Sequence, residues 1–341
     1  MSGSGAATMK AASINAANVL TLVRKRVDVN AVHAEARKPF RFLLCGDPGL
    51  VSDFRALLLR ALPEQNVPLD AASTLETIDP ARRATIVGQD ARCVVFLGRP
   101  GDVAGARLDL LQGLKLPIFA LTVDPGAPPP PQPPVAPTAG QIAEYTVARL
   151  DRDALRGRVF PHIVDRCKGI EIAVGRRLPA MRETVAAKLT RDAASSALKI
   201  AAASAVVDHV PLLGIVLGAV ASAGDMVAIT GIQIVLMLQI GATYGKDPDI
   251  QHIWELLPVV GGGLGWRSLS RELAGFIPVA GVAIKGAIAY AGTIVVGEGV
   301  GFFYEHGRHM SAVQAGQLYE ERKRDALSFA RGMMSRINKK L

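Results

Sequence analysis

The residues whose types and spacing come closest to a chemical motif are LLCGDPGLVSDF, at 43–54. An apolar run reaches Gly46 and a helical pattern follows, which is the arrangement of a nucleotide-binding loop. A phosphate-binding loop requires Gly-x4-Gly-Lys-Ser/Thr, because converging backbone N–H groups, a lysine and a hydroxyl on magnesium hold the phosphates. With Gly46 as the first glycine, Val51 stands at the second glycine, Ser52 at the lysine and Asp53 at the hydroxyl. The pattern therefore lacks most of the chemistry that a phosphate-binding loop needs.

We interpret the motif as a degenerate phosphate loop. It comprises Gly46, Asp47, Pro48, Gly49, Ser52 and Asp53. Two other interpretations stay open: a plain strand-to-helix turn, for which Pro and Gly are ordinary residues, and a weak anion site at the helix N-terminus. A guanine-reading Asn-Lys-x-Asp is also missing, since Asp124 follows a late apolar run without the Asn-Lys pair. We expect no GTP, no other cofactor and no catalytic residues, which favours a non-enzyme.

Histidine and cysteine offer little further chemistry. The closest cluster is EHGRH, with Glu305, His306 and His309, but Gly307 is expected to break the helix between the two histidines. The three cysteines stand far apart and indicate neither a disulfide framework nor a zinc site. No metal site is predicted.

The elements that would position the loop belong to an α/β domain at 39–150. Apolar runs alternate there with helical stretches, which predicts a parallel sheet with crossover helices. The runs read FRFLLCG, RCVVFLG, LPIFALTV and, more weakly, AEYTVARL, with a further strand near ASTLETI. A proline-rich insertion at 124–140 is expected to be an extended surface excursion. Residues 1–38 are predicted to form a helical arm, with one helix over 14–38.

From 151 to 341 the pattern predicts helices throughout. In RRLPAMRETVAAKL an apolar stripe lies on one side, and Arg182 is placed away from it. Two glycine-rich apolar blocks follow at 210–245 and 275–304, and spacings such as Gly297-x-x-x-Gly301 allow helices to approach closely.

The apolar blocks are long enough to cross a bilayer, but they contain or adjoin charged residues that lipid would penalise. A hairpin that enters the membrane and a compact soluble bundle therefore both remain open. Asp225 is expected to cap a helix that begins at Met226, or else to pair with Lys285 or Arg267. A final helix at about 314–338 has one apolar face and one basic face. The basic face could bind acidic lipid or RNA, or it could simply be the solvated side of a docked helix.

The charge and hydropathy of the whole chain narrow the class of partner. A net charge of +9 indicates an anionic partner. Aromatic residues make up only 5 %, too few for the stacking surfaces that single-stranded nucleic acid uses. The mean hydropathy of +0.27 is high for a soluble protein. Anionic membrane lipids are therefore favoured over nucleic acid, with a protein partner or self-association also expected.

Four stretches together resemble an uncharacterised bacterial family related to the YcjF inner-membrane proteins. They are ARKPFRFLLCGDPG, RRLPAMRETVAAKLTRDAA, VPLLGIVLGAVASAGDMVAITGIQIVLMLQIGATYG and GGGLGWRSLSRELAGFIPVAGVAIKGAIAYAGTIVVGEGVGFFYEHG. In related proteins a similar helical domain follows an Era-like GTPase domain. The positions that match the family's helical pattern are Pro211, Asp225, Gln233, Arg267, Arg271, Pro278, Lys285 and Gly297. The resemblance implies the cytoplasmic side of the bacterial inner membrane and partnership with GTPase-like domains, and it carries no established activity.

The function that these patterns favour is a non-catalytic, membrane-associated scaffold or adaptor with a pseudo-GTPase domain. One alternative is an active but atypical GTPase at the membrane. The other is a soluble, basic, nucleic-acid-binding protein.

Overall fold

The computed structural model describes residues 27–62, 65–79, 88–102, 108–126, 135–207, 214–249 and 282–338, and gives the backbone alone for 109–110, 202–207, 214–227, 282–285 and 329–338. Four of the positions that match the family pattern, Pro211, Arg267, Arg271 and Pro278, lie outside these residues, as does most of the proline-rich insertion. Asp225 and Lys285 are placed by their helix backbone only.

The N-terminal part contains a five-stranded sheet in which every pairing is parallel. The strands are β1 (Arg41–Gly46), β2 (Leu75–Thr77), β3 (Ala91–Gly98), β4 (Ile118–Val123) and β5 (Ile142–Val147), in the order β2-β1-β3-β4-β5. This order is that of flavodoxin-like doubly wound sheets, with a switch point between β1 and β3. The predicted α/β domain is confirmed, including the two weaker strands.

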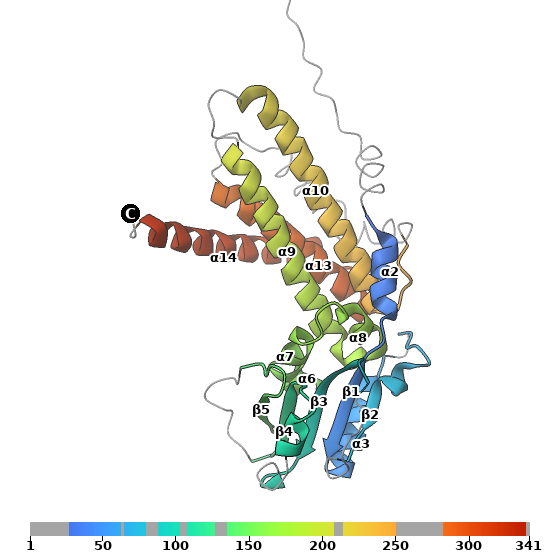
Figure 1. Ribbon diagram of the computed structural model, residues 1–341. Coiled ribbons are helices and arrows are strands. Elements are labelled where there is room, and N and C mark those ends of the chain that lie inside the picture. The colour runs from blue at the N-terminus through green and yellow to red at the C-terminus, as the bar shows by residue number, and fades with distance from the viewer. Residues whose placement is uncertain are drawn as a thin grey trace, which may run out of the picture.

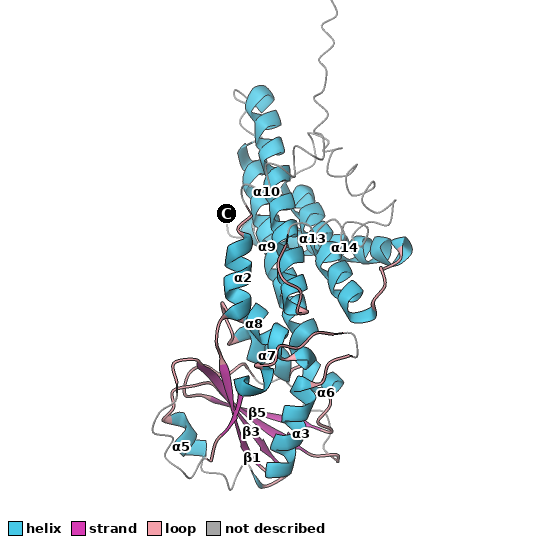
Figure 2. Cartoon of the chain, turned by 90° about the vertical axis from the view of Figure 1, so that its right-hand side faces the viewer, coloured by secondary structure: helices cyan, strands magenta, loops and turns pink. Residues whose placement is uncertain are grey.

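Alternation along β1 directs side chains to two different cores. Phe42 and Leu44 face α3 (Pro48–Leu59), whereas Leu43 and Cys45 face α5 (Leu108–Gln112). Figure 2 shows these two helices on opposite faces of the sheet. Strands covered on both faces need apolar residues at every position, which explains the continuous apolar runs.

The C-terminal part is helical, as predicted, and long helices extend away from the sheet (Figure 1). Its elements are α6 (Arg152–Arg156), α7 (Val159–Asp165), α8 (Glu171–Arg177), the 3-10 turn η2 (Pro179–Met181), α9 (Arg182–Val207), α10 (Gly214–Thr243), α13 (Val282–His306) and α14 (Ala312–Asn338). The sheet part also has a 3-10 turn, η1 (Ala71–Thr74). Close packing of α13 on α9 centres on Gly297, where a Cβ would overlap the Thr190 side chain. The glycine spacing in α13 thus serves helix contact, as expected.

The sheet and the helices share one hydrophobic core. A single cluster of buried side chains includes Phe42 and Phe119 of the sheet, Phe160 of α7, Met181 of η2 and Val296 of α13. The α/β pattern changes to a helical pattern near residue 150, but the hydrophobic core continues from the sheet into the helices.

Three expectations are corrected. The helix predicted over 14–38 is interrupted, because Asp28 is the N-cap of α2 (Val29–Arg37) and accepts from Ala31 N at 3.0 Å; residues 1–26 lie outside the description. Asp225 cannot cap a helix from Met226, since α10 runs unbroken from Gly214 through both residues. Arg182, placed away from the apolar stripe, is fully buried.

Candidate functional site

The turn between β1 and α3 consists of Asp47 alone, because β1 ends at Gly46 and α3 begins at Pro48. Gly46 has a φ of 115°, and a Cβ there would overlap the carbonyl group of Leu97 on β3. Asp47 N donates to that same carbonyl at 2.8 Å. The chain therefore passes directly from strand to helix, without the wider loop that surrounds a phosphate.

The carboxylate of Asp47 occupies the N-terminus of α3. Its Oδ1 accepts from Leu50 N at 2.9 Å, and Pro48 at the first helical position has no N–H to offer. Ser52 and Asp53 are exposed on the first turns of α3. The six predicted loop residues do lie together, but the protein's own anion already takes the position at which a helix N-terminus would bind a phosphate.

Asp124 follows β4 and closes a local turn. Its Oδ1 accepts from Gly126 N at 3.0 Å, and its own N donates to Val147 O of β5 at 2.9 Å. These contacts give Asp124 a structural role at the end of the sheet.

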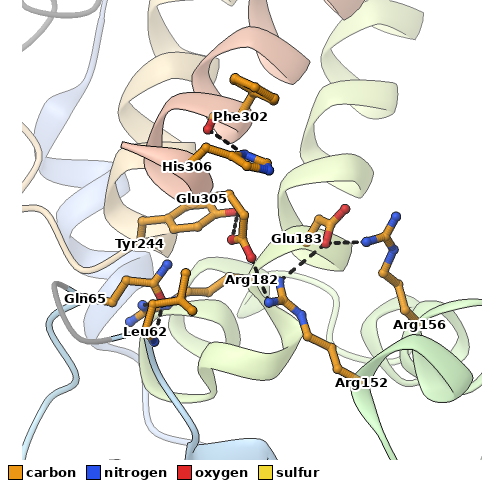
Figure 3. A network of polar contacts seen from close by, with 10 residues as sticks. All are labelled: Leu62, Gln65, Arg152, Arg156, Arg182, Glu183, Tyr244, Phe302, Glu305 and His306. Carbon is orange, nitrogen blue, oxygen red and sulfur yellow. Dashed lines mark hydrogen bonds and ion pairs between the residues drawn. The ribbon is translucent and has the colours of Figure 1, made fainter. Parts of the chain in front are cut away.

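A second constellation, which the sequence patterns do not reveal, joins the sheet part to the helices (Figure 3). Arg152 of α6 forms ion pairs with Glu305 of α13 at 2.7 Å and with Glu183 of α9 at 3.4 Å. Arg156 adds a 2.6 Å contact to Glu183. Tyr244, just beyond α10, donates its hydroxyl to Glu305 at 3.2 Å. We call these residues, with Arg182, the junction network; it draws on α6, α9 and α13 and on Tyr244, which follows α10.

Arg182 borders the ion pairs of the junction network and has no carboxylate partner among the contacts described. Its guanidinium donates to Gln65 Oε1 at 2.9 Å, to Asn66 O at 2.6 Å and to Gly175 O at 3.2 Å. It also lies 5.8 Å from the centre of the Tyr244 ring. Because Gln65 and Asn66 belong to the segment between α3 and η1, Arg182 fastens the sheet part to the helices.

Burial governs the ionisation of this network. Loss of hydration lowers the pKa of Arg182 to about 10. Burial also lowers the pKa of Arg152, but the hydrogen bond and charge of Glu305 outweigh it, so the pKa is raised overall. Burial first, and Glu305 second, raise the pKa of the Tyr244 hydroxyl. At neutral pH both arginines are charged and Tyr244 is a neutral donor.

A cavity of about 490 Å³ opens beside the network, between α9, α13 and α14. Its inner end is polar, with Glu183, Tyr244 and Glu305, and Gly297 lies on its α13 wall. Burial raises the pKa of Glu298, which Arg322 of α14 approaches at 3.8 Å. The small residues that let α13 approach α9 thus also leave space next to the junction network.

Gln233 and Thr293 tie α10 to α13. Gln233 is buried, and its Nε2 donates to Thr293 Oγ1 at 3.4 Å. Thr293 Oγ1 in turn donates to Ala289 O at 2.8 Å. Of the positions matching the family pattern, Gln233 and Gly297 are therefore placed at contacts between the long helices.

The residues of the predicted histidine cluster each contact a different set of local partners. Glu305 is engaged by Arg152 and Tyr244, His306 Nδ1 lies 3.1 Å from Phe302 O, and the His309 ring stacks on Phe303. Gly307 ends α13 with a φ of 65°, the helix break that the sequence predicts. Within the described part of the chain, no group of three His, Cys, Asp or Glu side chains is arranged to hold a metal ion.

One helix among the described residues, Gly286–His306, has the length and composition to cross a membrane. The most apolar stretch of this helix is 67 % buried inside the protein, as a core helix of a soluble protein would also be. Comparison of the chain with protein-family models, with curated proteins and with solved structures finds no match.

Proposed function

We propose that this protein is a non-catalytic scaffold or adaptor that associates with a membrane through its helical part and carries a GTPase-like α/β domain without a nucleotide. The observation that carries the proposal is the Asp47 carboxylate, which caps α3 at 2.9 Å from Leu50 N. A nucleotide phosphate at this helix N-terminus would meet a fixed negative charge, and no lysine follows in the motif to offset it.

The helical part supports membrane association by its length and composition. Among the described residues, Gly286–His306 of α13 has the length and composition to cross a membrane, for which about 20 apolar residues suffice. The buried Gln233–Thr293 contact is the type of polar link that joins helices in an apolar surrounding. With the YcjF-like pattern, these features favour the cytoplasmic side of a bacterial inner membrane.

The junction network supports a scaffold role. The network and the shared core fix the sheet part against the long helices, so that a partner bound to one part is held in a defined position relative to the other. The partner we propose is another protein, GTPase-like in the YcjF-like setting, or a second copy of this chain.

Membrane fractionation tests the proposal. The full chain is expressed in a bacterial host, and membranes are washed first with high salt and then with alkaline carbonate. We expect the protein to stay with the membrane after the salt wash, because apolar contact does not depend on ionic strength. Complete recovery in the soluble fraction before any wash would overturn the membrane assignment.

A further inference from the structure

The last helix, α14, begins at a firmly defined point. Ser311 N and Oγ donate to Gln314 Oε1 at 3.1 and 3.0 Å, and Gln314 N donates back to Ser311 Oγ at 3.2 Å. This reciprocal pair is a capping box, which satisfies backbone N–H groups at a helix start. Together with the turn at Gly307, it sends the chain back across α13.

The first part of α14 packs against α13. Ala315, Leu318 and Tyr319 form a small core with Ala291 and Val295. Figure 1 shows α14 running across the other long helices, with its carboxyl end outside the group formed by α9, α10 and α13. We call residues 327–338 the distal segment; at 1.5 Å per residue it is about 17 Å long.

Charge divides α14 at Asp325. Within 320–325 three acidic and three basic residues offset one another's charge. Arg322 lies 3.4 Å from Glu321 and 3.5 Å from Asp325, and Lys323 lies 3.5 Å from Glu320. After Asp325 the sequence holds no acidic residue. The basic residues from there on are Arg331, Arg336, Lys339 and Lys340.

The distal segment also has an apolar face by its spacing. Leu327, Ala330, Met334 and Ile337 follow one another at intervals of three or four residues, which places them on one side of a helix. A helix with an apolar stripe and an excess of arginine and lysine, and with no acidic residue, binds in the interface of a negatively charged membrane.

We propose that the distal segment is the site at which this protein binds an anionic lipid surface, with α14 lying along that surface. The inference rests on the proposed membrane association and adds to its apolar contact a second, charge-dependent contact at the distal segment. Lipid fits better than nucleic acid, because the leucine, methionine and isoleucine side chains require an apolar environment that phosphates and sugars do not offer.

The test is co-flotation of the full chain with vesicles of phosphatidylcholine alone or with about a third phosphatidylglycerol. The variant R331E/R336E reverses two charges in the distal segment. The control R60E/R149E changes the net charge equally at two exposed arginines of the α/β domain. Circular dichroism and melting temperature serve to confirm that both variants fold.

We expect the wild type to bind anionic vesicles at least about tenfold more tightly than neutral ones, with affinity falling as salt rises. R331E/R336E should lose about tenfold or more of this affinity, and the control should retain it.

Equal binding of R331E/R336E and wild type to anionic vesicles would overturn the inference while leaving membrane association intact. Equal binding of the wild type to both vesicle types would do the same. No binding to either vesicle would count against both proposals, and binding to an RNA oligonucleotide in place of vesicles would reassign the segment to nucleic acid.

Discussion

The β1–α3 turn and the junction network differ in how far apart their residues lie in the sequence. All the residues that define the turn, from Gly46 to Asp53, fall within one short stretch, and Leu97 and Arg99 reach it from the end of β3 and the residue that follows it. The junction network joins Gln65, Arg152, Arg182, Tyr244 and Glu305, which no periodicity relates. The motif that resembles a nucleotide-binding loop forms a compact turn. The partly buried polar network, by contrast, consists of residues that only folding brings together.

The strongest test of this contrast is Arg182→Met, which keeps much of the side-chain volume but removes every donor. The carbonyl groups of Asn66 and of the buried Gly175 would then lose this donor, and we expect the free energy of unfolding to fall by about 4 kcal/mol. Urea denaturation measures the change. The exposed Arg149→Met should remain within about 0.5 kcal/mol of wild type. A similar midpoint for both variants would show that the junction contributes little.

The turn is tested by Gly46→Ala. The positive φ and the overlap with the Leu97 carbonyl should together cost about 3 kcal/mol of unfolding free energy. Gly101→Ala separates the two causes, since Gly101 has a φ of 93° but nothing within 4 Å of an added Cβ. We expect about 1 kcal/mol there. Equal losses in urea denaturation would mean that the contact with β3 is unimportant.

Tyr244→Phe removes a single hydrogen bond from the junction network. The Glu305 carboxylate would keep Arg152 but lose the hydroxyl at 3.2 Å, so the expected loss is about 1 kcal/mol. A double-mutant cycle with Glu305→Gln isolates the pair. Strict additivity of the two single changes would exclude coupling between Tyr244 and Glu305.

The smallest effect is expected in the cavity, from Glu298→Gln. Burial raises the pKa of Glu298, so the cost of its charge is fully present above that pKa and disappears as the pH falls through it. The variant should therefore melt slightly higher than wild type at about pH 7.5, and the difference should close toward about pH 4. A difference in melting temperature that is constant with pH would contradict the raised pKa of Glu298.

Much of the fold could be predicted because it depends on local pattern. The apolar runs of β1 and β3 predict strands. The spacing of Ser311 and Gln314 indicates where α14 begins. Asp47-Pro48 also held a readable signal, an N-cap residue followed by proline at the first helical position. The network could not be predicted in the same way. Arg182 lies beside the apolar stripe of α9, and its burial depends on Gln65 and Asn66, which reach it from another part of the chain.

The central claim, that the β1–α3 turn supports structure and holds no nucleotide, is tested most directly by calorimetric titration of the full chain with GTP and magnesium. We expect no saturable heat from the wild type up to about millimolar nucleotide, because Asp47 caps α3 and the motif lacks the lysine and the hydroxyl. Asp47→Ala should give the same result, because the lysine and the hydroxyl are still missing. Saturable, magnesium-dependent binding by the wild type would contradict the account and restore the GTPase alternative.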